Sequence, residues 1–457
     1  MEQGSIQDGT DRKKGGMTEA SSAFRCILRE LIREGFCGWQ VVSELLQWHL
    51  STNNSGCVMK INASRLLERL ADLARIGALE GGGVQRLAFS EEDLAGRNWV
   101  QVQLERLGVE VRIDPVGNLF GIWNPSRGRG AVMFGSHTDT VGRAGRLDGA
   151  LGVVGALEVL ETLMESDWRP ARPLILASFV NEEGVRFMPD MMGSLFHAGS
   201  LSPEDARAAT DRDGVSVGSE LDRLGMAGSA TLDDPGVETF LELHIEQGPV
   251  LEQLPADIGV VTGVQGLSWF QVEVRGASNH AGTTPMDLRR DAGAEADALK
   301  VRLRELPARL APLRLTIGSS DCFPNLVNVI PDRVRFTVDL RHPTEEGLAE
   351  AEQAVADILG NGRDTTWHSL ARVSPCDFDA QVVEAVAEAA AALDLRANRM
   401  ISGASHDAQI LQRCYRSGMI FIPSRGGISH HPDEFSTDTQ MTNGVNTLLG
   451  AVMRLAD

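Results

Sequence analysis

Short apolar runs alternate with longer amphipathic segments along most of the chain, and this alternation limits the possible folds more than any other feature. The runs 132–134 and 173–180 have the composition of buried strands, and the segment 149–164 between them has a helical pattern. Strands that alternate with helices form a mainly parallel sheet covered by helices. The sequence therefore predicts an α/β fold with further helices at 92–107 and 380–393 and further strands at 109–112, 239–244 and 419–422.

The order of elements changes between residues 266 and 380. Here the pattern predicts strand 269–274, helix 287–304, strands 313–317 and 333–340, helix 345–359 and strand 367–373. This βαββαβ order is the ferredoxin-like arrangement. We therefore expect a small α+β domain at 266–380, inserted into a larger domain made of residues 59–265 and 381–457.

Residues 1–58 differ from the rest of the chain. The segment 23–50 could form one or two short amphipathic helices, and the polar segment 51–56 has the composition of a linker. A regular helical pattern starts only after residue 61, where Asn62 is a possible N-cap. We expect residues 1–58 to be an extension that is poorly ordered or partly helical.

Composition limits the class of partner. The formal net charge of −20 argues against nucleic acid and anionic membranes, because both require a basic surface. The six cysteines include no CxxC pair, so a disulfide framework is not expected and the reducing cytoplasm is the predicted location. No apolar stretch reaches the roughly 18 residues needed to span a bilayer, and the N-terminus lacks the apolar centre of a signal peptide.

Potential metal ligands follow three of the predicted strands. His137 and Asp139 follow the first, Glu182 and Glu183 the second, and His244 ends the third. A fourth group lies near the C-terminus, in the segment 426–434, which contains His430, His431 and Glu434. In open α/β sheets, sites form at the carboxyl ends of the strands.

Each of these residues alone has an ordinary structural explanation. Asp148 could cap the helix that follows it, the Glu182–Glu183 pair could be a solvated helix start, and either His430 or His431 could be the relevant imidazole. Taken together, imidazoles and carboxylates without cysteine are the ligands of hydrolytic Zn, Mn or Co centres. A second carboxylate beside a ligand carboxylate can accept a proton from a metal-bound water.

The ordered set of motifs resembles one known family. The motifs are HTDTV with Asp148-Gly149, then NEEG, HIEQGP and SHxPxE, and they run from about residue 60 to the end of the chain. They are similar to those of the amidohydrolase branch of the metallopeptidase-like family M20. That branch contains N-carbamoyl-L-amino-acid hydrolases, bacterial and yeast β-ureidopropionases and allantoate amidohydrolases. The resemblance implies a dinuclear-metal catalytic domain and an inserted domain that acts as lid and dimerisation domain.

The resemblance also implies a role for each motif residue. Two divalent ions (Zn, Mn, Co or Ni) are expected per subunit, with Asp148 bridging them and Glu182 as general base. Asp139 is expected to orient the imidazole of His137. The remaining ligands implied are His137 and His244 for the first ion and Glu183 and His430 for the second.

Substrate-binding residues are implied in both domains. In the inserted domain they are His280, Asn328 and Arg341, which in this family typically reach the active site of the partner subunit in a homodimer. The planar guanidinium of Arg341 suits a substrate carboxylate, although a surface arginine at a strand end is the alternative. In the larger domain the expected substrate-binding residues are Gln247, Ser405 and His406, with Ser405 replacing a glycine of the family pattern.

The function implied is hydrolysis of the carbamoyl C–N bond of N-carbamoyl-L-amino acids or N-carbamoyl-β-alanine, which releases the amino acid, ammonia and carbon dioxide. Allantoate hydrolysis is the main alternative, because the same metal set and lid residues serve both reactions. An M20-type peptidase or aminoacylase and a non-catalytic binding protein are more remote alternatives. A binding protein would have no need of Glu182.

Overall fold

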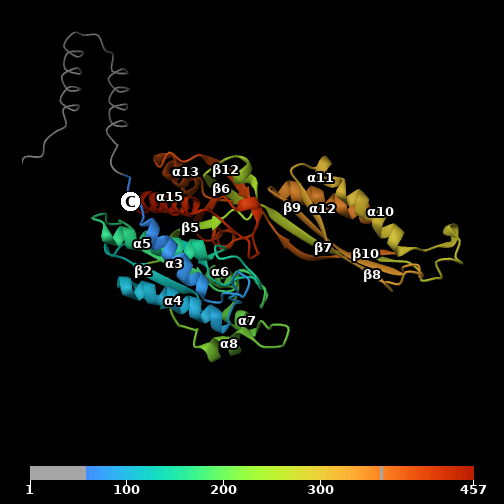
Figure 1. The fold of residues 1–457 in the computed structure, drawn as a ribbon, viewed down its shortest axis with the longest axis horizontal. Helices are drawn as coiled ribbons and strands as arrows, with labels where there is room; N and C mark the ends of the chain where they lie inside the picture. The colour runs from blue at the N-terminus through green and yellow to red at the C-terminus, as the bar shows by residue number, and fades with distance from the viewer. Residues whose placement is uncertain (1–57, 361–363) are drawn as a thin grey trace, which may run out of the picture. The chain divides into compact units, whose positions relative to one another are not determined.

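The computed structural model describes residues 58–360 and 364–457, so the expectations for residues 1–57 lie outside the described part of the chain. Within these ranges the expected fold class is confirmed. A nine-stranded mixed sheet has the order β1-β2-β4-β3-β5-β13-β6-β11, with β12 paired to β6. A separate four-stranded sheet lies between β6 and β11 in the sequence (Figure 1).

The centre of the large sheet is parallel. Its four adjacent strands are β4 (Leu174–Phe179), β3 (Ala131–His137), β5 (Val237–Ile245) and β13 (Arg416–Ile422). Strands buried on both faces are nearly continuous apolar runs, and every residue of β3 and β4 is buried. Because the strands are parallel, their carboxyl ends meet at one edge of the sheet. The flanking strands are β1 (Glu110–Ile113), β2 (Leu119–Trp123), β6 (Ile258–Val264), β11 (Cys376–Asp377) and β12 (Ala397–Ser402).

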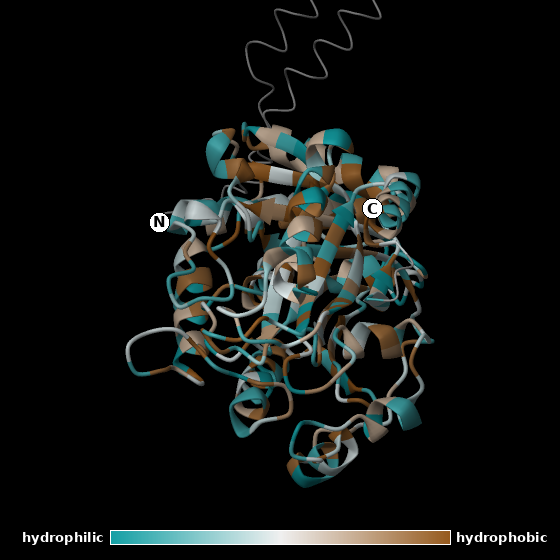
Figure 2. Ribbon diagram, turned by 90° about the vertical axis from the view of Figure 1, so that its right-hand side faces the viewer, coloured by the Kyte–Doolittle hydropathy of each residue, from teal (hydrophilic) through white to brown (hydrophobic). Residues whose placement is uncertain are grey.

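Long helices cover this sheet and pack on one another. In Figure 2 they carry both brown and teal segments, as expected for helices with one face on the sheet. The buried side chains of these helices and of the large sheet form one continuous core. The helices are α3 (Ala63–Arg75), α4 (Glu91–Leu107), α5 (Ala150–Glu165), α13 (Ala380–Ala392) and α15 (Asp438–Ala456). The expected cap is present, since the Asn62 side chain accepts a hydrogen bond from the Arg65 N–H at the start of α3.

The second sheet has the strand order β10-β7-β9-β8 with every pair antiparallel, as the ferredoxin-like arrangement requires. Its strands are β7 (Gly266–Arg275), β8 (Arg314–Phe323), β9 (Arg333–His342) and β10 (Thr365–Val373), and its helices are α10 (Ala292–Arg304) and α12 (Glu345–Leu359). These elements share a core of their own. The chain re-enters the large sheet at β11, which pairs with β6.

The sequence pattern misplaced several boundaries and missed several elements. The strand predicted at 313–317 extends to Phe323, and the strand predicted at 269–274 begins at Gly266. The helix predicted from residue 287 begins only at Ala292, because Asp291 caps it and Met286–Leu288 is a separate 3-10 turn. The strands β2, β6 and β12 and the long helix α15 were not predicted. The shorter elements are α6 (Met192–His197), α7 (Pro203–Ala208), α8 (Val217–Leu224), α9 (Val250–Gln253), α11 (Leu306–Arg309), α14 (Asp407–Leu411) and a 3-10 turn at Arg425–Gly427.

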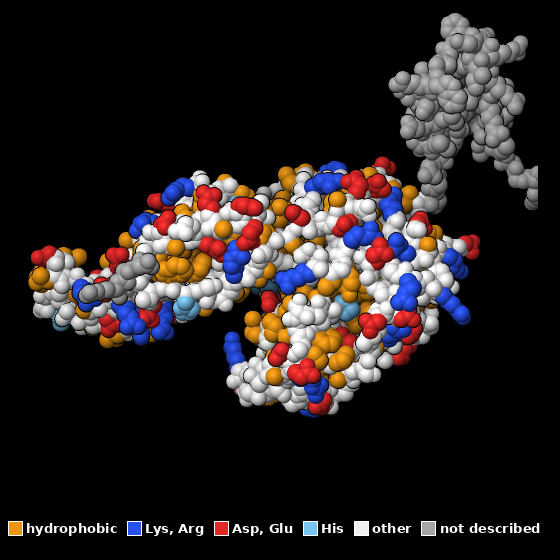
Figure 3. Space-filling view, turned by 180° about the vertical axis from the view of Figure 1, so that it is seen from behind, with side chains coloured by type: hydrophobic (Ala, Val, Ile, Leu, Met, Phe, Trp, Pro, Cys, Tyr) orange, Lys and Arg blue, Asp and Glu red, His pale blue; other side chains and the backbone are white. Residues whose placement is uncertain are grey.

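On the face in Figure 3, basic side chains are scattered among acidic ones. Among the helices of the described residues, none combines the length and the apolar character needed to cross a membrane.

Candidate metal centre

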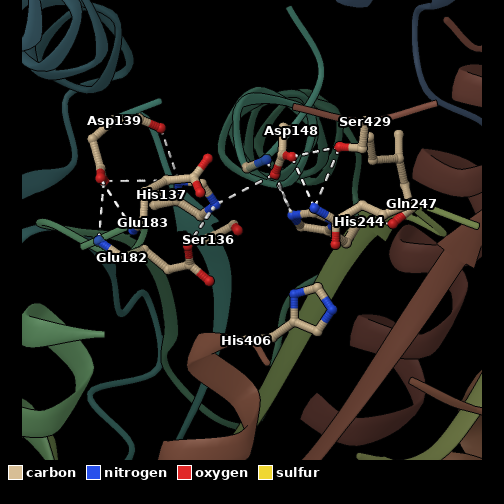
Figure 4. Close-up of polar contacts among 12 residues, drawn as sticks. Ser136, His137, Asp139, Asp148, Glu182, Glu183, His244, Gln247, His406 and Ser429 are labelled. Atoms are coloured by element: carbon tan, nitrogen blue, oxygen red, sulfur yellow. Dashed lines mark hydrogen bonds and ion pairs between the residues drawn. The ribbon is translucent and has the colours of Figure 1, made fainter. Parts of the chain in front are cut away.

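The four parallel strands deliver imidazoles and carboxylates to one place. His137 ends β3, Glu182 and Glu183 follow β4, His244 lies near the end of β5, and His430 lies in the loop after β13. Figure 4 shows most of these side chains converging. Potential ligand atoms lie within 4.8 Å of one another in two sets that share Asp148, and these sets are His137–Asp148–His244 and Asp148–Glu183–His430.

His137 presents a buried nitrogen without a partner. Its Nδ1 lies 3.0 Å from the backbone oxygen of Asp139, which leaves Nε2 as the free lone pair. This Nε2 is buried and makes no hydrogen bond within the described part of the chain. Burial, the largest cause, lowers the pKa of His137 to about 4, so the ring is neutral and able to bind a cation.

Gly149 allows His137 to pack closely. A Cβ added to Gly149 would lie 2.4 Å from the His137 ring, and the residue has a φ of +61°. Only glycine combines this backbone conformation with this closeness at low cost. In the Asp-Gly pair of the motif, Asp148 is therefore needed as a potential ligand and Gly149 is needed because a larger residue would collide with His137.

Asp148 points into the site and does not cap α5. The helix begins after Gly149 and has no side-chain cap. The Asp148 carboxylate lies 3.1 Å from His244 Nε2, 3.7 Å from His137 Nε2 and 3.5 Å from His430 Nε2. Burial alone would raise the pKa of Asp148, but the hydrogen bond and charge of His244 and the other imidazoles outweigh it and hold the pKa well below its usual range.

His244 is the charged partner of Asp148. Burial lowers its pKa, but Asp148 and the neighbouring carboxylate of Glu242 act more strongly and the net pKa is about 9. Its Nδ1 lies 2.9 Å from the Ile245 carbonyl oxygen, so Nε2 is directed at Asp148.

Glu182 is a buried residue and Glu183 a partly buried one whose side chain is shielded from solvent, so the pair is not a solvated helix start. Glu182 is 5% exposed, and its carboxylate lies 3.5 Å from His137 Nε2. Burial, followed by the repulsion between neighbouring carboxylates, raises the pKa of both groups well above the usual range. One carboxylate oxygen of Glu183 is buried and has no hydrogen-bond partner among residues 58–360 and 364–457. Such an excess of buried carboxylates is stabilised by a cation.

Asp139 does not hold His137 by its carboxylate. The backbone oxygen of Asp139 contacts the ring, whereas its carboxylate is 3.7 Å away. That carboxylate instead accepts the N–H groups of Glu182 and Glu183, each at 3.3 Å. Asp139 therefore fixes both the imidazole and the Glu182–Glu183 segment.

The structure distinguishes the two neighbouring histidines. His430 Nε2 lies 3.5 Å from both Asp148 and Glu183. His431 instead accepts the N–H of Asp433 through Nδ1 and is outside the cluster. Gln247 donates to Asp148 at 2.9 Å, and its own Oε1 is buried without a partner.

Two further carboxylates at the site had no assigned role in the sequence prediction. Glu434 accepts the N–H groups of Leu147 and Asp148 at 2.9 and 3.1 Å, and it accepts the Ser429 hydroxyl at 3.0 Å. Glu242, fully buried on β5, accepts the Ser136 hydroxyl at 2.6 Å and the Ala408 N–H at 3.0 Å. The only sequence signal for Glu434 was its place in the SHxPxE motif, and Glu242 stood inside an apolar strand.

Four of the expected substrate residues, Gln247 among them, border a cavity of about 200 Å³ beside the cluster. Arg341 reaches it from β9, and Ser405 and His406 reach it from the loop before α14. His406 packs on His244 with ring centroids 4.6 Å apart, and its Nε2 lies 3.1 Å from the Ser402 hydroxyl.

The structure does not bring His280 and Asn328 to this cavity. They are neighbours of each other, since the Ala281 N–H donates to the Asn328 carbonyl oxygen at 3.0 Å. Asn328 precedes the first residue of β9, whereas Arg341 is near its end. At about 3.4 Å per strand residue, Arg341 lies about 27 Å along the strand from Arg333, its first residue.

The donor set fits a divalent metal. It consists of imidazole nitrogens and carboxylate oxygens, with buried ligand atoms on His137 and Glu183 that have no other partner in the described residues. This combination suits Zn, Mn, Co or Ni. The cluster can therefore bind divalent metal.

Comparisons with known proteins agree on one family. The model of peptidase family M20/M25/M40 matches residues 133–454. The allantoate amidohydrolase of Bacillus subtilis (strain 168) is 36% identical over 398 residues, which cover 84% of this chain and 95% of that protein. The N-carbamoyl-L-amino-acid amidohydrolase of Paenarthrobacter aurescens is 34% identical over 416 residues, covering 88% and 99%. The crystal structure of a hydantoinase/carbamoylase-family amidase from Burkholderia multivorans superposes with a TM-score of 0.83 at 37% identity, covering 87% and 98%.

Proposed function

Because the chain belongs to peptidase family M20/M25/M40, we propose that it is a metal-dependent amidohydrolase that cleaves the carbamoyl C–N bond of N-carbamoyl-L-amino acids or N-carbamoyl-β-alanine. The observation that carries this proposal is the position of Glu182, a buried carboxylate 3.5 Å from His137 Nε2 and outside the two ligand sets that share Asp148. Glu182 also forms a third possible ligand set with His137 and Glu183. Because the two sets that share Asp148 already supply three ligands each, Glu182 is available for proton transfer.

Two divalent ions are proposed, with Asp148 between them. His137 and His244 complete the first ligand set, and Glu183 and His430 complete the second. When bound, divalent ions in such a site lower the pKa of a water molecule and polarise a carbonyl oxygen.

Glu182 acts as the general base. It accepts a proton from the attacking water and returns it to the departing nitrogen, so one carboxylate serves both halves of the reaction. Asp139 holds the backbone of Glu182 and Glu183 through two N–H groups and thereby fixes the position of the base. Arg341 binds the substrate carboxylate, and Gln247, Ser405 and His406 border the bound ureido group.

A homodimer supplies the remaining substrate residues. His280 and Asn328 lie at the end of the second sheet that is remote from Arg341, so they would serve the cavity of the partner subunit. This arrangement agrees with their exposure in one chain. The cytoplasmic location remains a prediction.

Allantoate is the second candidate substrate. Allantoate also combines a carboxylate with ureido groups, and the B. subtilis relative named above carries that activity in its name. Arg341 would bind the carboxylate of allantoate, and one of its ureido groups would lie at the metal ligands.

The test is ammonia release by the full chain after loading with Mn²⁺ or Zn²⁺. N-carbamoyl-L-amino acids, N-carbamoyl-β-alanine and allantoate are offered in parallel, with Glu182→Gln as the control variant. We expect the unmodified chain to turn over at least one of these compounds. The rate should fall by a factor of about 100 or more in Glu182→Gln, whereas the amount of bound metal, measured by elemental analysis, should stay the same. Turnover of none of the ureido compounds by the metal-loaded protein would contradict the proposal.

A further inference from the structure

A second arginine lies beside Arg341 and is not used by the proposed reaction. Arg314 on β8 is the direct cross-strand partner of Arg341 on β9. Residues directly opposite in an antiparallel pair have their side chains on the same face of the sheet. The two guanidinium groups therefore extend toward the same region.

Both groups converge on Gly403. Arg341 Nη1 donates to the Gly403 carbonyl oxygen at 2.8 Å, and a Cβ added to Gly403 would lie 2.7 Å from Arg314 Nη1. A side chain at position 403 would press against the guanidinium group of Arg314. Arg341, Gly403 and Arg314 border one cavity, which forms a passage between the two arginines.

Two further cavities continue this passage. One of about 300 Å³ is bordered by Arg341, Gly403 and Arg314, and it shares Arg341 with the cavity at the metal centre. The other, of about 850 Å³, also includes Arg314 and Gly403. Much of its remaining wall is apolar and includes Pro312, Pro343, Met400, Ile401 and Phe421.

The charge in this passage is unbalanced. Asp339 pairs with Arg341 at 3.1 Å, whereas no carboxylate of the described residues lies within ion-pair distance of Arg314. Glu246 borders the larger cavity, and the charge of Arg314 acts to lower its pKa against the larger effect of burial. Its carboxylate forms no ion pair with Arg314 and accepts the N–H groups of Val250 and Leu251 at 2.7 and 2.8 Å. Arg399 also borders the larger cavity, but it is paired with Glu384. An arginine that has no ion-pair partner among the described residues, at the end of a passage with partly apolar walls, suits a short methylene chain that ends in an anion.

We propose that Arg314 is a specificity residue that binds a second carboxylate of the substrate. This inference rests on the proposed function. With the ureido group at the metal centre and the α-carboxylate on Arg341, the substrate side chain passes Gly403 and its terminal carboxylate meets Arg314. The preferred substrates are then N-carbamoyl derivatives of acidic amino acids.

The experiment compares substrates that differ only in this charge. KM and kcat are measured on the metal-loaded full chain with N-carbamoyl-L-glutamate, N-carbamoyl-L-glutamine and N-carbamoyl-L-methionine. The variants are Arg314→Met and Arg314→Lys. The control is Arg335→Met, which removes another arginine of the second sheet whose charge is paired with Glu273.

We expect the unmodified chain to have a KM for the glutamate derivative about tenfold or more below that for the glutamine derivative, as a charge-assisted hydrogen bond requires. Arg314→Met should remove this preference through KM with kcat little changed, Arg314→Lys should keep part of it, and Arg335→Met should keep all of it.

Two results would overturn the inference while leaving the proposed function intact. They are a preference for the methionine derivative over the glutamate derivative, or a glutamate preference that survives Arg314→Met. Turnover of none of the carbamoyl compounds, nor of N-carbamoyl-β-alanine or allantoate, would overturn both the proposed function and this inference.

Discussion

Replacing Glu434 tests how the protein positions Asp148. The carboxylate is 5% exposed and accepts the N–H groups of Leu147 and Asp148 through one oxygen. Glu434→Ala leaves both buried N–H groups without an acceptor, at about 1–3 kcal/mol each. Glu434→Gln keeps an amide oxygen for them. Both changes remove the repulsion between Glu434 and Asp148, which together with burial raises the pKa of Glu434 to about 7.

The difference between the two variants therefore reports the hydrogen bonds together with the packing of the buried side chain, and not the change of charge. We expect metal-free Glu434→Ala to unfold in urea with a free energy about 2–4 kcal/mol lower than Glu434→Gln, which allows for partial replacement by water. We also expect Mn²⁺ affinity, measured by calorimetry, to fall about 10- to 100-fold in Glu434→Ala, because the segment that carries Asp148 loses its support. Equal unfolding free energies and equal Mn²⁺ affinities for the two variants would refute this reasoning.

Three further predictions concern single residues. Gly149→Ala places a methyl group against the His137 ring at a residue with a positive φ. It should abolish high-affinity Mn²⁺ binding and lower the free energy of unfolding, measured by thermal unfolding, by about 1 kcal/mol or more. Mn²⁺ affinity equal to that of the unmodified chain would contradict the packing argument. His430→Ala should lower Mn²⁺ affinity and His431→Ala should not, and the reverse order in calorimetry would show that the wrong imidazole is assigned. Burial lowers the pKa of His197 to about 4, so its neutral form contributes stability above pH 6.5 that is lost as pH falls toward 4. Between pH 7 and pH 4, the free energy of unfolding in urea should therefore fall by about 3 kcal/mol less in His197→Gln than in the unmodified chain. If the two proteins show the same dependence of unfolding free energy on pH, His197 does not have this role.

Local sequence patterns were sufficient to predict the buried central strands and the amphipathic helices. The apolar strands β3, β4 and β5 were found because burial on both faces requires nearly continuous apolar residues. The helix α3 was found because Asn62 caps an amphipathic pattern. The strands β2, β6 and β12 were missed because they lie outside the regular alternation of strand and helix.

The sequence by itself determined the fold class and the chemistry of the site. Polar ligands after apolar strands meet at one edge because the strands are parallel, and this follows from local patterns alone. Only the tertiary structure decided that Asp148 faces three imidazoles and leaves α5 uncapped. Only strand pairing placed Arg314 beside Arg341, and only the loop after β13 placed Glu434 under Asp148. These contacts join residues far apart in the chain, and sheet order and register, which local periodicity does not encode, bring them together.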